Sequence, residues 1–295
     1  MPSVGTLVQQ RLVDQRDALD AAEAAVRGGD RSTGVHDLRV AMRRLRSLLA
    51  TYRPVFDTAV TEPMRDELKS ASRRLGEARD AEVATDHTDR LLEAADVGLE
   101  DEAVAGLRAR LRLDAAAAGD VVEETLGSTR YAAMTIRLDE LVSSPPLTDT
   151  SELDARKVAR RRLRREQRRF AKRVEAARMP VDVSDPDAPH DVTEHGARLH
   201  EVRKAAKRVR YAAETARPVT GKKTRQIGKR AKAVQSALGA YHDVVMTRAT
   251  LRHLALDEAV GEAAAFLLGH LDADEQREMA AIEQRAWDSI DAALA

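Results

Sequence analysis

The 295-residue sequence contains no cysteine, which excludes disulfide bonds, thiolate nucleophiles and thiolate metal sites. Aromatic residues are also scarce, at 3% of the chain. Sheets favour aromatic and β-branched residues, whereas the alanine, leucine, arginine and glutamate that abound here favour helices. With 43% hydrophobic residues the chain can bury a substantial core. The composition therefore predicts an all-α protein.

Long apolar stretches are missing as well. No run of about 18 apolar residues occurs, and residues 1–16 carry charges among their apolar residues where a leader would have an apolar region. The lack of cysteine is compatible with a reducing compartment. We therefore expect a soluble, cytoplasmic protein that does not associate with membranes.

The net charge is zero, with 49 basic and 49 acidic residues, but the two signs are segregated along the chain. Residues 156–232 hold 25 Lys or Arg and 9 Asp or Glu, an excess of 16 positive charges that the remainder balances. Such asymmetry indicates a polyanion-binding surface within an otherwise acidic body. The alternative is that acidic helices simply neutralise basic ones in solvated ion pairs, which individually contribute little.

One pattern of a histidine and three cations occurs twice, spaced i, i+3, i+7 and i+10. The first copy is His36, Arg39, Arg43 and Arg46, and the second is His200, Arg203, Lys207 and Arg210. An X-Pro-Val step follows each copy, at Pro54 and Pro218. In a helix the four positions fall within a stripe roughly 80° wide. The sequence thus predicts a duplicated scaffold that directs two basic ridges at an anionic partner.

Apolar residues on both ridge helices alternate by three and four, as in a coiled-coil seam. The first seam is Val35, Leu38, Met42, Leu45, Leu49 and Tyr52, and the second is Leu199, Val202, Ala206, Val209, Ala213 and Ala216. The basic stripe lies roughly 110° from the seam, beside the core. We therefore expect each ridge to border a groove or channel between helices.

Periodicity and breakers predict twelve helices. Their ranges are 6–27, 35–52, 62–78, 81–95, 100–126, 129–142, 153–178, 193–216, 222–238, 243–257, 258–269 and 273–294. Ser143-Ser144-Pro145-Pro146 is the best linker, so we expect two halves, 1–144 and 145–295. The second half contains an additional Asp/Pro-rich loop at 181–191.

A second match follows each ridge. Leu75-Gly76-Glu77-Ala78-Arg79-Asp80 aligns with Leu238-Gly239-Ala240-Tyr241-His242-Asp243. At these residues the sequence resembles the CHAD family, whose name refers to conserved histidines in an α-helical domain. The ridge residues that carry the resemblance are His36, Arg39, Arg43, Arg44 and Arg46, then His200, Arg203, Lys204, Lys207, Arg208, Arg210, Tyr211 and Glu214.

The resemblance covers essentially the whole chain. It implies two helical bundles, formed by an internal duplication and related by a pseudo-two-fold axis around a central basic channel, and it implies binding of inorganic polyphosphate. His242 departs from the family, in which this position more often looks like asparagine. Many relatives carry a fused triphosphatase-type domain of acidic strands. This sequence shows no such segment, so we expect a stand-alone module.

Polyphosphate carries about one charge per phosphate, and guanidinium groups can bind its oxygens bidentately while condensed counterions are released. We expect Arg39, Arg43, Arg46, Arg203, Lys207 and Arg210 to contact phosphate directly. Lys69, Arg73, Lys229 and Lys232 would extend the path, and Arg161, Arg165, Arg168 and Lys172 would flank it. The remaining members of the candidate set are Arg44, Arg79, Lys204, Arg208 and His242.

His36 and His200 have two interpretations, phosphate contact or a structural hydrogen bond, with metal ligation as a minor third. A cationic neighbourhood should lower the pKa of either imidazole, and a bound polyanion should raise it. If an imidazole gains a proton on binding, affinity rises below about pH 7.

Two other functions stay open. Arginine ridges also bind nucleic acids, although the ridge helices offer only Tyr52 and Tyr211 for stacking on bases. His36-Asp37 and His242-Asp243 could belong to a metal-dependent phosphohydrolase, but the residues on the face of His36 are cationic. We expect a non-catalytic binding or targeting module without a cofactor, associated with polyphosphate granules. The protein partners, the oligomeric state and the role of Trp287, as core residue or dimer contact, are left open.

Overall fold

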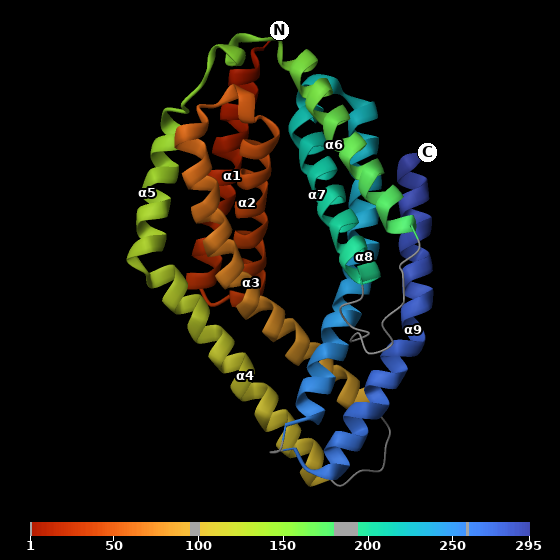
Figure 1. The fold of residues 1–295 in the computed structure, drawn as a ribbon. Helices are drawn as coiled ribbons and strands as arrows, with labels where there is room; N and C mark the ends of the chain where they lie inside the picture. Colours follow the sequence, from red (N-terminus) through yellow and green to blue (C-terminus); the bar gives the residue numbers. More distant parts are fainter. Residues whose placement is uncertain (1, 95–100, 180–193, 258–259) are drawn as a thin grey trace. The chain divides into compact units, whose positions relative to one another are not determined.

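The computed structural model describes residues 2–94, 101–179, 194–257 and 260–295 (Figure 1). In these ranges the chain forms helices, and its β pairings are two isolated bridges. The predicted all-α fold class is confirmed. The α-helices are α1 (Val4–Arg27), α2 (Arg31–Thr51), α3 (Thr58–Ala94), α4 (Asp101–Gly127), α5 (Thr129–Ser143), α6 (Ala155–Arg178), α7 (Glu194–Thr220), α8 (Lys222–Ala255) and α9 (Glu262–Leu294). Two 3-10 helices complete the described elements, η1 (Arg53–Val55) and η2 (Asp149–Glu152).

Both predicted seams are buried. Each of the six seam residues of α2 is at most 1% exposed, and each of the six on α7 is at most 4% exposed. The basic residues that alternate with these seams remain partly or fully exposed. The coiled-coil-like spacing therefore correctly predicts which side of each ridge helix faces the core.

Local signals account for the first two helices. The side chain of Ser3 accepts a hydrogen bond from the backbone N–H of Thr6 at the start of α1, and the Asp30 carboxylate accepts one from Thr33 at the start of α2. Gly29, with φ +96, makes the turn between them. A Cβ at Gly34 would lie 2.6 Å from Cγ2 of Val26, so this glycine allows α1 and α2 to approach closely.

Three predicted helix breaks are wrong. Helices are expected over 62–78 and 81–95, but α3 continues through Gly76 and beyond residue 80. Likewise α8 continues through Gly239, and α9 continues through Gly269. A glycine in a helix interior costs only about 0.5–1 kcal/mol relative to alanine, which the surrounding helix formers and packing outweigh.

The prolines of the X-Pro-Val steps behave differently. Pro54 lies in η1, just after the end of α2, as the sequence predicts. Pro218 instead lies inside the last turn of α7, which ends at Thr220 and not at residue 216. Pro218 has no N–H to donate, so one helical hydrogen bond is missing, and the helix ends two residues later at Thr220. The predicted Asp/Pro-rich loop at 181–191 lies outside the described residues.

The chain divides into two compact units. Unit 1 comprises Met1–Arg79, Ala118–Arg168 and Arg208–Lys229, and unit 2 comprises Asp80–Ala117, Arg169–Lys207 and Arg230–Ala295. Every boundary between them falls inside a helix, and each unit draws on both halves of the sequence. The predicted division into halves 1–144 and 145–295, the internal duplication and the pseudo-two-fold axis stay predictions.

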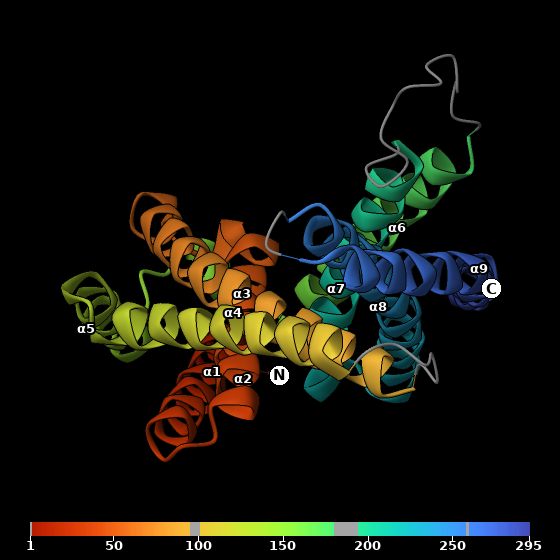
Figure 2. The ribbon, with the colours of Figure 1, turned by 90° about the horizontal axis from the view of Figure 1, so that it is seen from below.

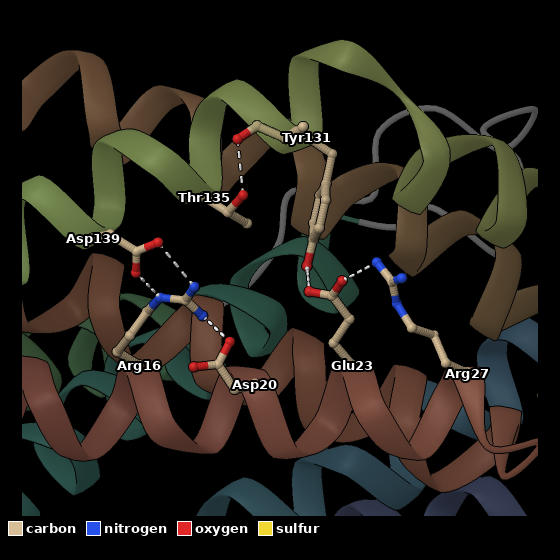
Figure 3. Close-up of polar contacts among 8 residues, drawn as sticks. Arg16, Asp20, Glu23, Arg27, Tyr131, Thr135 and Asp139 are labelled. Carbon is tan, nitrogen blue, oxygen red and sulfur yellow. Dashed lines mark hydrogen bonds and ion pairs between the residues drawn. The ribbon is translucent and has the colours of Figure 1, made fainter.

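In unit 1, polar contacts fasten α5 to α1 (Figure 3). Nε of Arg16 donates to the Asp139 carboxylate at 2.5 Å, and the Tyr131 hydroxyl donates to Glu23 at 3.2 Å. Burial, with the charge of Glu23 second, raises the pKa of Tyr131, so the hydroxyl keeps its proton. None of the predicted binding residues takes part, which indicates a structural role for this contact.

In unit 2, α6 and α7 lie side by side in both ribbon views (Figures 1 and 2). The Arg198 guanidinium donates to the carbonyl oxygens of Ala176 at 3.2 Å and Met179 at 2.7 Å, so it caps the end of α6. Leucines of α3, α4, α8 and α9 form a buried apolar group in unit 2. Its members are Leu92, Leu107, Leu111, Leu251, Leu254, Leu267, Leu268 and Leu271.

Trp287 is half-buried on α9. Its indole N–H donates to Glu283 at 3.1 Å, and the Arg178 guanidinium lies 5.4 Å from its ring centroid. Glu283 also bonds His195 at 2.7 Å and is the main cause of a raised pKa for that imidazole. Trp287 thus has polar and cationic neighbours within unit 2.

Candidate anion-binding site

The first group of cations lies in unit 1 around α2. His36, Arg39, Arg43 and Arg46 share one side of this helix. The charges of Arg39, Arg43 and Arg79 act on His36, and those of Arg43, Arg65 and Arg208 act on Arg46. We call this set the α2 cluster: His36, Arg39, Arg43, Arg46, Arg65, Arg79 and Arg208. Apart from one histidine, every member is an arginine.

Acidic residues also lie at this cluster, and Glu62 forms an ion pair with Arg65. Asp37 acts on His36, and Asp66 acts on Arg46, in each case against the combined effect of the arginines. Nε of Arg43 is buried and has no hydrogen-bond partner within the described parts of the chain. The α2 cluster is therefore a concentration of fixed positive charge that is partly removed from water.

The second group lies in unit 2 around α7. It consists of His200, Arg203, Lys204 and Lys207 of this helix together with His242 of α8, and we call it the α7 cluster. The rings of His200 and His242 are 5.4 Å apart between centroids, with an angle of 51° between their planes. Lys204 also donates to Glu201 on its own helix at 2.5 Å. Two of the five members of this cluster are imidazoles.

All three cluster histidines have lowered pKa values. Partial burial is the main cause in each case, because it disfavours the charged imidazolium. The next contribution comes from Arg43 for the pKa of His36, from Lys204 for that of His200 and from Arg203 for that of His242. The predicted direction is confirmed, although burial outweighs the cationic neighbours. The rings are therefore mainly neutral near pH 7.

The pKa of Arg46 is lowered as well. Burial lowers its pKa most, followed by the charge of Arg65. A guanidinium nevertheless stays protonated in proteins, so Arg46 keeps its charge in the free protein although burial and the neighbouring arginines disfavour it. An anion placed beside Arg46 would raise this pKa again, because an opposite charge favours the charged form.

Glu214 collects a third group of arginines in unit 1. Its carboxylate lies 3.5 Å from Arg11, 3.2 Å from Nε of Arg44 and 2.8 Å from Nε of Arg210. The guanidinium groups of Arg44 and Arg210 also lie 5.9 and 5.8 Å from the ring centroid of Tyr211. Two predicted binding residues, Arg44 and Arg210, are thus held by a carboxylate. Arg11 of this Glu214 network also forms an ion pair with Asp14 at 3.4 Å.

The aromatic residues of the ridge helices are not available for stacking. Tyr52 is 1% exposed and Tyr211 is 7% exposed. Burial raises the pKa of Tyr52, with the Arg162 charge as an opposing influence. Neither ring presents a free face to a nucleobase.

The structure does not place every candidate within a cluster. Lys69, Lys229 and Lys232 are exposed, and Arg73 forms an exposed ion pair with Glu77 at 3.5 Å. The candidates on α6 point to solvent: Arg161, Arg165, Arg168 and Lys172 are all exposed. These eight residues stay predicted contacts.

Sequence reasoning missed three arginines. Arg65 precedes Lys69 by one helical turn, so the stripe of residues 65, 69 and 73 on α3 could have revealed it. Arg11 reaches Glu214 only through the packing of α1, for which the sequence holds no signal. Arg162 is 7% exposed within a run of exposed arginines, and burial lowers its pKa most.

Neither a metal site nor a membrane-spanning helix is found among the described residues. Among the described residues, no group of three or more His, Cys, Asp or Glu side chains is arranged to hold a metal ion. None of the described helices combines the length and apolar character needed to span a bilayer.

The CHAD domain model matches residues 10–252. The chain therefore belongs to the CHAD family, as the two histidine-containing motifs predict. Two uncharacterized proteins of Mycobacterium tuberculosis, MT2285 of strain CDC 1551 / Oshkosh and Rv2226 of strain ATCC 25618 / H37Rv, are each 31% identical to it over 297 residues. The match covers 97% of this chain and 52% of theirs. The chain thus spans about half the length of these relatives.

Two solved structures share the fold. The CHAD domain from the plant Ricinus communis is 28% identical, with a TM-score of 0.73 over 99% of this chain and 92% of that one. PptA from Streptomyces chartreusis has a TM-score of 0.80 at 24% identity, over 98% of this chain and 99% of that one. The second likeness concerns the fold alone.

Proposed function

We propose that this protein binds inorganic polyphosphate through the α2 and α7 clusters, as a non-catalytic binding or targeting module. The observation that carries the proposal is a group of six arginines from α2, α3 and α7 in unit 1: Arg39, Arg43 and Arg79 act on His36, and Arg43, Arg65 and Arg208 act on Arg46. Arginine in this density is suited to phosphate, because its planar fork matches phosphate oxygens and its charge persists at every physiological pH.

The chemistry of the ligand fits both clusters. Polyphosphate is a flexible thread without bases, so it needs cations along its path and no stacking surface. The burial of Tyr52 and Tyr211 supports this ligand over single-stranded nucleic acid, which usually stacks on exposed aromatic rings. A channel lined by both ridges stays a prediction of the family resemblance, as does association with polyphosphate granules.

The test is a calorimetric titration of the protein with long-chain polyphosphate, double-stranded DNA and single-stranded RNA. Each ligand is titrated at about 50 and about 300 mM salt, because phosphate contacts weaken steeply with salt. The variant Arg43→Glu/Lys207→Glu reverses one charge in each cluster. Its matched control, Arg112→Glu/Arg285→Glu, reverses two exposed charges elsewhere in the chain.

We expect polyphosphate to bind at both salt concentrations and at least about 10²-fold more tightly than either nucleic acid. The cluster variant should abolish this binding, whereas the control should keep most of it. Equal affinities for all three ligands that vanish together at high salt would instead indicate an unselective basic surface. Hydrolysis of polyphosphate that requires added Mg²⁺ or Mn²⁺ would contradict the non-catalytic part of the proposal.

A further inference from the structure

The Leu-Gly step that follows each ridge places a glycine directly beneath a ridge arginine. A Cβ added to Gly76 would lie 3.1 Å from Nη2 of Arg39 and 3.5 Å from both its Cζ and its Nε. A Cβ added to Gly239 would lie 3.5 Å from Nη2 and 4.0 Å from Nε of Arg203. The two contacts occur separately, the first within unit 1 and the second within unit 2.

Conformational freedom does not explain these glycines. Both lie inside long helices, α3 and α8, and neither is among the described glycines with positive φ, Gly29 and Gly221. Alanine would be the better helix former at both positions. What glycine supplies is close approach, because both residues are buried and an arginine lies next to each: an added Cβ would be in tight contact with Arg39 at Gly76 and in ordinary contact with Arg203 at Gly239.

Other helical glycines show that the contact is not general. Gly106 of α4 and Gly269 of α9 have no atom within 4 Å of an added Cβ. Gly119 of α4 does lie under an arginine, since its Cβ would lie 2.2 Å from Nη1 of Arg31. Arg31, however, pairs with Glu123 at 3.1 Å and belongs to neither cluster. Gly106 and Gly269 are therefore controls without a neighbouring side chain among the described residues, and Gly119 is a control beside an arginine outside the clusters.

We propose that Gly76 and Gly239 are positioning residues that let the guanidinium groups of Arg39 and Arg203 lie close against a helix, in the orientation that receives phosphate. The inference rests on the proposed function and names how the same clusters are preorganised. Arginine has a long side chain with many rotamers, so fixing it before the ligand arrives reduces the entropy lost on binding. The glycine is therefore part of the anion site although it touches no anion.

The test compares alanine variants by calorimetric titration with long-chain polyphosphate. We expect Gly76→Ala to weaken binding by roughly 2- to 10-fold, the cost of ordering one rotamer-rich side chain on binding. Gly239→Ala should have a smaller effect, because its Cβ would make an ordinary contact at 3.5 Å. Gly119→Ala and Gly269→Ala should leave affinity unchanged. Gly269→Ala should also raise the Tm, which shows that alanine is tolerated in these helices.

A double-mutant cycle separates positioning from a general structural effect. If Gly76 acts through Arg39, Gly76→Ala should have no further effect on affinity in an Arg39→Ala background. An equal loss of affinity in both backgrounds would overturn the proposal, as would unchanged affinity in Gly76→Ala alone.

An NMR measurement of the Arg39 and Arg203 Nε–Hε groups does not depend on the ligand. We expect ordered signals in the free wild type and a more mobile Arg39 signal in Gly76→Ala, with no change in Gly269→Ala. If wild type fails to bind polyphosphate, the proposed function is wrong, and these signals still decide whether glycine fixes the arginine. A mobile Arg39 in wild type would overturn the positioning role itself.

Discussion

Arg79 in the α2 cluster and His242 in the α7 cluster hold equivalent places in the two sequence motifs, three residues after the glycine of each Leu-Gly step. Each also acts on the histidine of its own ridge, Arg79 on His36 and His242 on His200. The α2 cluster has a permanent charge at this place, and the α7 cluster has one that depends on pH. Two copies of one motif thus present different electrostatics to the same kind of ligand.

The difference extends to the remaining members. Position 43 is arginine where its counterpart, Lys207, is lysine, and Arg65 and Arg208 add two further guanidinium groups that act on Arg46. At neutral pH we therefore expect the α2 cluster to supply most of the affinity. The α7 cluster should adjust that affinity as its imidazoles gain or lose protons.

The largest effect should come from inactivating one cluster at a time. At about pH 7.5, Arg39→Glu/Arg43→Glu should weaken polyphosphate binding by about 10²- to 10⁴-fold, since the two charge-assisted hydrogen bonds contribute about 1.5–3 kcal/mol each. Arg203→Glu/Lys207→Glu should weaken binding less, by roughly 10- to 10²-fold, because we expect each contact of the α7 cluster to contribute less than this range. Calorimetry measures both, and circular dichroism checks that the helices persist. Equal losses would remove the distinction between the clusters.

Next in size is the pH dependence of binding. The free imidazoles of His200 and His242 have lowered pKa values, and a bound polyanion raises them, so binding takes up protons. Affinity should rise as pH falls through the pKa values of the complex and level off below those of the free protein. The gain is up to about tenfold per pH unit for each proton taken up.

The groups that face His242 are Arg203, Lys207, Asp243 and Asp80, together with the ring of His200. Titrations at about pH 6 and about pH 8.5 bracket the ordinary imidazole pKa. The variant His200→Gln/His242→Asn should lose most of the pH dependence, and His36→Gln should lose less of it. Equal affinity of wild type at both pH values would contradict the proton-coupled mechanism.

A reciprocal exchange sharpens the comparison. His242→Arg should strengthen binding at about pH 8.5 by roughly 3- to 10-fold, because it gives the α7 cluster a charge that does not titrate in this range. Arg79→His should weaken binding at the same pH and increase the pH dependence of the α2 cluster. The measurement is, for each variant, the ratio of its polyphosphate affinity at about pH 6 to that at about pH 8.5. If both exchanged variants keep the wild-type ratio, these positions do not determine the difference.

The smallest effect concerns stability without ligand. His200 and His242 have pKa values below that of the unfolded chain, so unfolding takes up protons and stability falls as pH drops below about 6.5. His195 acts in the opposite direction: its raised pKa adds stability below the unfolded value, which is lost as pH rises through the folded one.

Thermal unfolding at about pH 7.5 and about pH 5.5 tests this balance. The Tm of His200→Gln/His242→Asn should fall less on acidification than that of wild type, by roughly 1–2 °C. The Tm of His195→Gln should fall more than that of wild type. A common drop in all three proteins would show that these imidazoles do not control acid stability.

The seams of α2 and α7 could be predicted because burial follows directly from apolar spacing, and Val35 and Leu199 illustrate it at the start of each seam. The continuation of α3 past residue 80 and of α8 through Gly239 could not. A breaker rule scores glycine by conformational freedom, whereas here the residue is helical and supplies space for an arginine. The rule also fails at Gly269, where α9 continues although no side chain of the described residues lies within 4 Å of an added Cβ.

The Glu214 network marks the limit of reasoning from spacing. Arg210 and Glu214 are one turn apart on α7, so their ion pair could be anticipated. Arg11 and Arg44 come from α1 and α2, and only tertiary packing brings them to the same carboxylate. Arg44 and Arg210 are correctly predicted as basic members of the ridges, but the carboxylate that holds them is not.

The α2 cluster contains guanidinium and imidazole groups but no primary amine, whereas the α7 cluster contains the ε-amino groups of Lys204 and Lys207. Acylation acts on lysine amines and removes their charge, while it leaves guanidinium groups intact. Acetylating conditions would thus neutralise part of the α7 cluster and none of the α2 cluster. The choice between lysine and arginine makes one copy of the motif chemically modifiable and leaves the other unaffected.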